Sequence, residues 1–235
     1  MKTVRLDKFL SENTALSRSQ IRTAVKRGEV SVNEKVIYDF SLKISPDEDS
    51  VCLNGEIINN KKFIYLLLNK PSGILTASRD KSRETVLDLV PEEFKHYDLF
   101  AVGRLDKDTT GLLLITNDGD YAHRVISPKS NVEKDYIATV DGTPQKNAVS
   151  VLAEGVTLAD GTACRPAKLE FLNDDVVRVT ITEGKYHQVK RLLGFVGLGV
   201  KTLHRERIGS LCLPDNLNAG SITEINSDTA MLVFK

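Results

Sequence analysis

The residues best suited to chemistry lie in one segment, GRLDKDTTGLLLITNDG, over residues 103–119. It places the carboxylate of Asp106 in a turn-forming stretch just before an apolar run, 112–115, that is typical of a buried strand. A carboxylate on a loop that is anchored to a rigid strand can act as a nucleophile. The same carboxylate could instead cap the turn or pair with Arg104, and the RLD triplet alone favours that structural role.

Other catalytic and metal-binding patterns are missing from the sequence. The three cysteines are widely spaced, which favours neither a disulfide framework nor a zinc site, and the four histidines have no metal-ligand spacing. There is no GxGxxG or GxSxG, and Gly184-Lys185 lacks the upstream glycine of a phosphate-binding loop. We therefore expect no metal. A hydrolase that uses Asp108 as a second acid is a minor alternative.

Length and composition indicate a soluble globular protein. The chain has 235 residues, of which 41% are hydrophobic and 27% charged, enough to bury a sizeable core. No apolar run approaches the ~20 residues that a membrane-spanning helix needs. The first residues, MKTVRLDKFLSEN, are charged and lack the apolar stretch of a signal peptide. We expect a cytoplasmic protein.

The balanced total charge hides a basic segment at the N-terminus. The whole chain carries 32 basic and 32 acidic side chains, which taken alone argues against a nucleic-acid partner. Residues 1–35, however, hold eight basic and four acidic side chains. A local patch matters more than the total, because attraction to phosphate is screened beyond ~8–10 Å.

The first sixty residues have the pattern of a separate module. Apolar residues recur at helical spacing over 6–10, and a second helix is predicted to begin at Ser17 with a capping box to Gln20 and to end near Gly28. In the string EVSVNEKVI that follows, apolar and polar residues alternate, which predicts two strands of a hairpin joined by a turn at Asn33-Glu34. The polar stretch 54–62 is predicted to be a linker, so we expect domains over 1–59 and 60–235.

The rest of the chain alternates between strands and helices without a regular βαβ rhythm. This favours an α+β fold with a largely antiparallel sheet. The predicted strands cover 63–69, 136–140, 167–172 and 176–182, and the predicted helices cover 85–94, 121–126, 146–153 and 187–197.

The N-terminal strings RLDKFL and LSRSQIRTAVKRGEVSVNEKVI resemble the S4 RNA-binding module along its full length. Without this resemblance, a row of basic residues on one helix face would most often be explained as a helix face exposed to solvent. The resemblance implies contacts to RNA phosphates, which position a protein without reading bases. The residues implied are Arg5, Lys8, Ser17, Arg18, Arg22, Lys26 and Arg27.

The strings of the larger domain resemble, in order, those of pseudouridine synthases. GRLDKDTTGLLLITNDG is similar to the catalytic motif, and LLLNKPSGILTA (66–77) to the motif that precedes it. EKDYIATV (133–140) and EGKYHQVKRLL (183–193) resemble two further motifs, and HRERIG (204–209) resembles the closing strand of the small-subunit enzymes. Together they identify a member of the RsuA family of ribosomal RNA pseudouridine synthases, with an N-terminal S4 domain.

The resemblance implies a role for four residues. Asp106 is the catalytic carboxylate, which attacks a flipped-out uridine at the sugar C1′ or at ring C6. Lys190, 84 positions later in the chain, is the cation that pairs with it and favours its ionised form. Tyr136 stacks on the uracil, and Arg104 inserts where the uridine left its stack.

We therefore predict an α+β protein with two domains. A small N-terminal S4 (αL-type) RNA-binding domain precedes a catalytic domain with a mixed, largely antiparallel β-sheet flanked by helices. The predicted function is conversion of a uridine to pseudouridine in 16S rRNA, by a monomer that needs no cofactor and binds no membrane. The alternatives are a large-subunit (23S) rRNA synthase and a non-catalytic rRNA-binding assembly factor.

Overall fold

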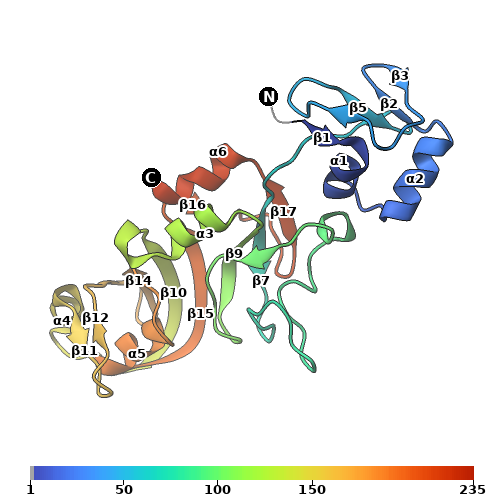
Figure 1. Cartoon of the computed structure of the whole chain (residues 1–235). Coiled ribbons are helices and arrows are strands. Elements are labelled where there is room, and N and C mark those ends of the chain that lie inside the picture. The colour runs from blue at the N-terminus through green and yellow to red at the C-terminus, as the bar shows by residue number, and fades with distance from the viewer. Residues whose placement is uncertain (1–2) are drawn as a thin grey trace. The chain divides into compact units, whose positions relative to one another are not determined.

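The computed structural model describes residues 3–235, and the chain divides into two compact units (Figure 1). The first unit runs to Phe63 and includes Val90–Asp98, whereas the second comprises Ile64–Leu89 and the chain from Leu99 onward. Each unit has its own cluster of buried apolar side chains. Within residues 3–235, no helix combines the length and the apolar character needed to cross a membrane.

Two short helices, α1 (Leu6–Asn13) and α2 (Arg18–Lys26), lie in the first unit. The predicted capping box at α2 is confirmed, because the Gln20 N–H donates to the Ser17 hydroxyl oxygen at 3.3 Å and the Ser17 N–H donates to Gln20 Oε1 at 2.8 Å. These bonds satisfy N–H groups that have no partner inside the helix. The helices bury six apolar side chains, Leu6, Phe9, Leu10, Ile21, Ala24 and Val25.

A small antiparallel sheet in the order β3-β2-β5-β6 completes this unit. The predicted hairpin is confirmed, with Asn33 and Glu34 at φ 50° and 67°. The predicted linker is partly wrong, because Asn54 and Gly55, at φ 51° and 83°, form a second hairpin turn. An Asn-Gly pair favours this turn because both central residues need positive φ. The strands are β1 Val4–Arg5, which pairs with β4 Lys43–Ile44, and β2 Val30–Val32, β3 Lys35–Val36, β5 Val51–Leu53 and β6 Glu56–Ile57.

The second unit is built on a nine-stranded mixed sheet. Its path is β13-β14-β10-β15-β9-β7-β17, with β16 paired to β15 and β8 to β9, and only β15 and β9 run parallel. This confirms the predicted α+β class and the largely antiparallel sheet. The strands are β7 Tyr65–Lys70, β8 Phe100–Ala101, β9 Thr110–Thr116, β10 Lys134–Gly142, β13 Lys168–Phe171, β14 Val176–Ile181, β15 Leu198–Ile208, β16 Leu211–Cys212 and β17 Ile222–Ile225, and the separate pair β11 Val156–Thr157 and β12 Ala163–Cys164.

Three of the four predicted helices of the larger domain form. The fourth, predicted over 85–94, is wrong, because only the short η1 forms there. The Val86 N–H instead donates to the Leu75 carbonyl at 2.9 Å, and Pro91 disfavours helical backbone in the residue before it. The helices are α3 Gly119–Ile126, α4 Ala148–Glu154, α5 Gln188–Phe195 and α6 Ser227–Ala230, with 3₁₀ turns η1 Glu92–Phe94, η2 Pro128–Ser130 and η3 Met231–Phe234.

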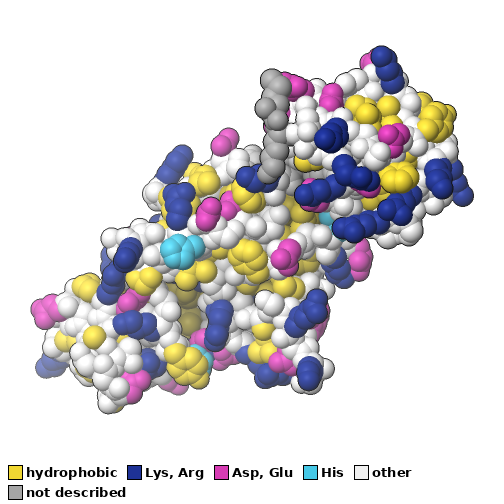
Figure 2. Space-filling model, viewed as in Figure 1, with side chains coloured by type: hydrophobic (Ala, Val, Ile, Leu, Met, Phe, Trp, Pro, Cys, Tyr) yellow, Lys and Arg dark blue, Asp and Glu magenta, His cyan; other side chains and the backbone are white. Residues whose placement is uncertain are grey.

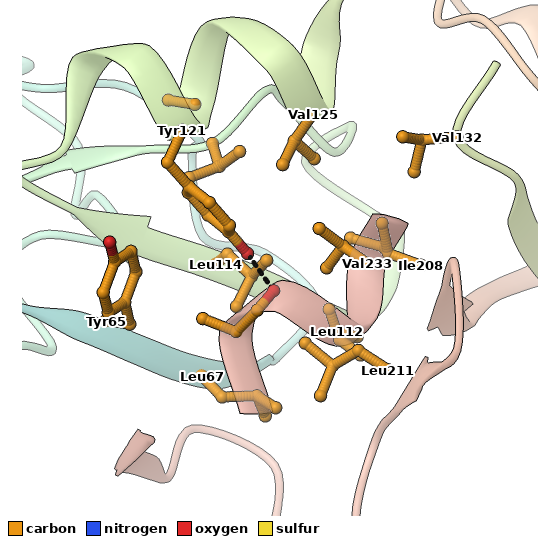
Figure 3. Close-up of a cluster of buried hydrophobic side chains, with 13 residues drawn as sticks. Tyr65, Leu67, Leu112, Leu114, Tyr121, Val125, Val132, Ile208, Leu211 and Val233 are labelled. Atoms are coloured by element: carbon orange, nitrogen blue, oxygen red, sulfur yellow. Dashed lines mark hydrogen bonds between the residues drawn. The ribbon is translucent and has the colours of Figure 1, made fainter. Parts of the chain in front are cut away.

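A buried cluster joins β7, β9, α3 and the last helical segments of the chain (Figure 3). Tyr121 is 2% exposed, and its hydroxyl donates to the Ala230 carbonyl at 2.8 Å. Leu112 and Leu114, alternate residues of β9, belong to the same cluster. Burial of each such side chain contributes about 1.5–3 kcal/mol, so β9 is firmly held where it leaves the segment that contains Asp106.

Gly111 allows β9 and β15 to pair close to that segment. It has φ 101°, and a Cβ at this position would overlap the backbone of Arg205. The two strands pair in parallel, with Thr110 opposite His204 and Gly111 opposite Arg205. A side chain at position 111 would separate the strands, so this glycine allows β15 to lie directly beside the start of β9.

Candidate active site

A pocket of about 440 Å³ opens in the second unit. Its wall is formed by the loop before β9, by α3, β10, β14 and β15, and by the segment that leads into α5. In Figure 2 the surface is hollowed between the segments around α3 and α5. Three residues predicted from the sequence, Arg104, Asp106 and Tyr136, line this pocket.

Asp106 lies in a tight loop at the pocket wall. Its carbonyl accepts the Thr109 N–H at 3.1 Å, and the Thr76 hydroxyl donates to the Leu105 carbonyl at 2.9 Å. Gly103, at the start of the loop, has φ 79°, which side chains rarely allow. The Asp106 side chain is 28% exposed, so the carboxylate is open to a ligand while its backbone is fixed.

Lys70, at the end of β7, fixes this loop from the interior. It is fully buried, and its Nζ donates to the carbonyl oxygens of Pro71, Lys107 and Thr109 at 3.0, 3.1 and 3.0 Å. Burial lowers the pKa of Lys70 to about 8, although two nearby carboxylates oppose this shift. Since a buried ammonium needs its hydrogen bonds, Lys70 and the three carbonyls hold one another in place.

Two basic side chains from the region of α5 reach Asp106. Lys190 Nζ lies 3.7 Å from Asp106 Oδ2, and His187 Nε2 lies 3.6 Å from Oδ1. Lys190 is closer to Asp108, at 2.6 Å, and this hydrogen bond lowers the pKa of the Asp108 carboxyl group. Lys190 therefore lies between two carboxylates, whereas the sequence predicted a pair with Asp106 alone.

Tyr136, on β10, and Arg205, on β15, form the inner wall of the pocket. They are 7% and 3% exposed. The Arg205 guanidinium donates through Nε to the Leu112 carbonyl at 2.8 Å and through Nη1 to the Tyr136 hydroxyl at 3.3 Å. The tyrosine ring is therefore held at its hydroxyl end by a buried cation.

A β-bulge brings Arg205 and Ile208 into the same pocket. Side chains alternate between the faces of a strand, so residues three apart would normally point to opposite faces. The register between β10 and β15 shifts at Asp135 and Tyr136, which leaves Glu206 as an extra residue. Because of this extra residue, the side chains of Arg205 and Ile208 both point into the pocket.

Lys134 adds a second buried cation to the pocket wall. It is 8% exposed, and its Nζ donates to the Val132 carbonyl at 2.8 Å. Burial, and to a lesser degree the charge of Arg205, lower the pKa of Lys134 to about 8. In the described chain, residues 3–235, no carboxylate forms an ion pair with Lys134 or Arg205.

The first unit carries the other predicted contact residues, and Figure 2 shows basic side chains gathered over α1 and α2. The Ser17 hydroxyl is engaged in the α2 cap, and the Arg22 guanidinium lies 5.1 Å from the centre of the Phe40 ring. Three others face acidic neighbours, in the pairs Arg5–Asp7, Lys8–Glu12 and Arg27–Glu29. All seven are exposed: Arg5, Lys8, Ser17, Arg18, Arg22, Lys26 and Arg27.

The sequence analysis did not single out four residues of this site: Lys70, Lys134, His187 and Arg205. All four lie in strings that were recognised as motifs. The sequence does not show their partners, because these are far away in the chain or are backbone atoms. Arg205 Nε, for example, donates to the carbonyl of Leu112, which is 93 positions away. The one available signal was a lysine at the end of an apolar run, LLLNK, because buried lysines are rare unless they have partners.

Two family models match the chain. Residues 64–194 match the model described as RNA pseudouridylate synthase, and residues 4–50 match the S4 domain. The chain belongs to the RNA pseudouridylate synthase family. The synthase is therefore an enzyme that acts on RNA, and its S4 domain binds RNA.

Relatives match over nearly the full length of the synthase. An uncharacterized RNA pseudouridine synthase of Bacillus subtilis, YtzG, is 39% identical over 98% of this chain and 98% of its own. A Haemophilus influenzae protein named ribosomal small subunit pseudouridine synthase A is 39% identical, over 92% and 94% of the two chains. A solved structure titled pseudouridylate synthase superposes with a TM-score of 0.68 at 35% identity, covering 98% of this chain and 99% of that chain.

Proposed function

We propose that the synthase converts one uridine of 16S rRNA to pseudouridine. The observation that supports this substrate is the 37–39% identity, over more than nine-tenths of the chain, to proteins named ribosomal small subunit pseudouridine synthase A. The HRERIG string at 204–209 favours the same substrate. The name of YtzG, at 39% identity, specifies no RNA class, so the proposal requires a direct test.

In this proposal Asp106 is the nucleophile. The target uridine leaves its stack and enters the pocket, because a carboxylate cannot reach C1′ or C6 of a stacked nucleotide. The bond between C1′ and N1 breaks, the uracil turns while it is held, and a bond forms between C1′ and C5. The hydrogen lost from C5 is balanced by one gained at N1, so the isomerisation needs no co-reactant.

Three further side chains support this chemistry. The Tyr136 ring, fixed by Arg205, stacks on the uracil, an interaction of about 1–3 kcal/mol per base. Lys190, 3.7 Å from Asp106, keeps positive charge beside the nucleophile. Arg104, exposed at the pocket wall, fills the gap that the uridine leaves in the RNA stack.

The S4 domain holds the substrate RNA through the basic side chains of α1 and α2. Contacts of this kind position an RNA without reading its bases. The cost of flipping is lowest in loops and irregular helices. We therefore propose ribosomal RNA with such a region around the target uridine as the partner of the S4 domain.

The decisive experiment is to map pseudouridine in rRNA from cells with and without this gene. One site in 16S rRNA should disappear in the deletion strain and return with the wild-type gene, but not with Asp106→Asn. Loss of a 23S site instead would overturn the small-subunit assignment. Return of the site with Asp106→Asn would overturn the role of Asp106.

A further inference from the structure

Tyr186 presents its ring to solvent at the edge of the pocket. It is 71% exposed, whereas Tyr136, which lines the same pocket, is 7% exposed. An exposed ring contributes little to folding, because the hydrophobic gain scales with the area removed from water. Within residues 3–235 its hydroxyl has no hydrogen bond, and only its backbone carbonyl has a side-chain partner, Arg191. Folding therefore does not explain this side chain.

Tyr186 is linked to Asp106 through His187. The two rings are parallel, with centroids 3.9 Å apart and an angle of 17° between their planes. His187 Nε2 in turn lies 3.6 Å from Asp106. His187 has φ 48° and ψ 33°, a left-handed conformation that is costly for a residue other than glycine and is concentrated at functional sites. The chain is thus bent so that one ring contacts the carboxylate and the next covers that ring.

The segment that carries both rings is fixed. Glu183, 4% exposed, accepts the Arg165 N–H at 2.9 Å and the Gln188 side-chain amide at 2.8 Å. Gln188, 3% exposed, accepts the Lys185 N–H at 2.8 Å. Because these buried bonds hold the segment on both sides of Tyr186, the ring has a defined position at the pocket edge.

We propose that the outer face of the Tyr186 ring stacks on a nucleobase that flanks the target uridine in the same RNA strand. The proposal rests on the proposed function of Asp106, because the pocket then holds the uracil and its neighbours must cross the rim. Arg104, which is exposed, also lines this rim and can neutralise a phosphate of the crossing strand. Aromatic rings beside cationic side chains are a common way to bind single-stranded RNA.

The first test is single-turnover kinetics on a transcript of the rRNA segment that the mapping identifies, whichever subunit it comes from. Tyr186→Leu should raise the RNA concentration for half-maximal rate by about 5- to 150-fold, as expected for loss of one stacked base. Tyr186→Phe and Tyr186→Trp should remain within about twofold of wild type. Phe195→Leu removes an exposed aromatic ring at the C-terminal end of α5, outside the pocket; it is the matched control and should have no effect.

The second test detects stacking directly. A transcript carries 2-aminopurine on one side or the other of the target uridine, and Asp106→Asn enzyme binds it without turnover. At one of the two positions the fluorescence should be quenched on binding, and Tyr186→Leu in the Asp106→Asn background should abolish the quenching. Quenching that persists in the double variant would overturn the proposal.

These measurements separate stacking from a purely structural role. If Tyr186 only held His187 in place, Tyr186→Leu would lower the maximal rate at saturating RNA and leave the half-saturating concentration unchanged, which contradicts stacking. Failure of the proposed function would look different, because wild-type enzyme would then form no pseudouridine in the transcript or Asp106→Asn would still form it.

Discussion

Alternate residues of β10 point to opposite faces of the central sheet, and each face has its own cleft. Lys134 and Tyr136 line the pocket that contains Asp106, whereas Asp135 and Glu133, the residue just before β10, line a second cleft of about 780 Å³. The larger cleft is therefore not the one that holds the candidate catalytic residues. Charge pairing distinguishes the two faces better than volume does.

In the second cleft both arginines have acidic partners. Arg207 lies 2.6 Å from Asp135 and 3.1 Å from Glu133. Arg178 lies 3.0 Å from Glu206 and 3.2 Å from Glu170. These pairs neutralise one another across neighbouring strands, so the arginines of this face need no ligand to balance their charge.

In the pocket, by contrast, Lys134 and Arg205 are buried without a carboxylate partner among the described residues. A buried charge without a counter-charge costs stability, and such groups concentrate at functional sites. We interpret the two cations as complementary to negative charge that develops on the uracil when its bond to C1′ breaks. The comparison therefore separates a face arranged for stability from a face arranged for chemistry.

The largest expected effect is at Asp106. Asp106→Asn should reduce the single-turnover rate by about four orders of magnitude or more, as removal of a catalytic group does in other enzymes. Binding of the RNA should remain within a few-fold of wild type, as measured by filter binding. A variant that retains more than a hundredth of the rate would contradict the nucleophile assignment and with it the functional contrast between the faces.

Arginine substitutions on the two faces should have opposite consequences. Arg205→Met leaves the Leu112 carbonyl and the Tyr136 hydroxyl without their donor, and it should lower kcat/KM by about 10- to 100-fold. Arg207→Met leaves the buried carboxylate of Asp135 without its cation and should instead reduce the free energy of unfolding by about 3 kcal/mol, with little change in kcat/KM.

Steady-state kinetics at a temperature where both variants are folded, together with urea unfolding, measure the two effects. Equal losses of activity in Arg205→Met and Arg207→Met would remove the distinction between the faces.

Lys70 provides a pH test of the interior support of the loop that carries Asp106. Its folded-state pKa is about 8, below the ordinary 10.5, so between these pH values the unfolded chain binds a proton that the folded chain does not. The free energy of unfolding should therefore rise with pH across this window. The pKa of Lys134 is also lowered to about 8, so this lysine makes a similar contribution. Lys70→Met should therefore halve, approximately, the part of the rise in the free energy of unfolding with pH that comes from these two lysines.

The measurement is urea unfolding of wild type and Lys70→Met from pH 7 to pH 11. Groups that titrate alike in both proteins cancel in the difference between the two curves. Curves that stay parallel across the window would show that Lys70 titrates normally.

Local signals predicted the local structure of this chain well. The Ser17 and Gln20 pair located the start of α2, and the Asn-Glu turn at 33–34 joined two strands, because the partners in each case are close in sequence. The helix predicted over 85–94 was wrong. The apolar spacing suits a helix, but the Val86 N–H donates to the Leu75 carbonyl instead, and Pro91 lies within the segment. Periodicity alone does not show where backbone hydrogen bonds go.

The site was only partly predictable, for a physical reason. Asp106 and Lys190 were expected to lie close together only because of a family resemblance, since no spacing rule connects residues 84 positions apart. The competing carboxylate of Asp108, the loop support by Lys70 and the bulge that turns Arg205 inward all depend on sheet register. Register is set by long-range packing, which a single sequence does not reveal.

The smallest expected effect concerns unpaired charges of the S4 domain. Arg18 and Lys26 of α2 are exposed and have no acidic partner in the described part of the chain, unlike Lys8 and Arg27. Arg18→Gln with Lys26→Gln should reduce the slope of log affinity against log salt by about 0.7 per cation. The maximal single-turnover rate should not change, because these contacts position the RNA and do not touch the reacting base.

Lys146→Gln, which removes an exposed lysine that lies outside both clefts, is the matched control and should leave the slope unaltered. A slope that is the same in the α2 double variant and in wild type would mean that phosphates are bound elsewhere on the synthase. A lower maximal rate in the double variant would mean that the α2 charges also influence chemistry, which would weaken the distinction between charges that position RNA and charges that act on the base.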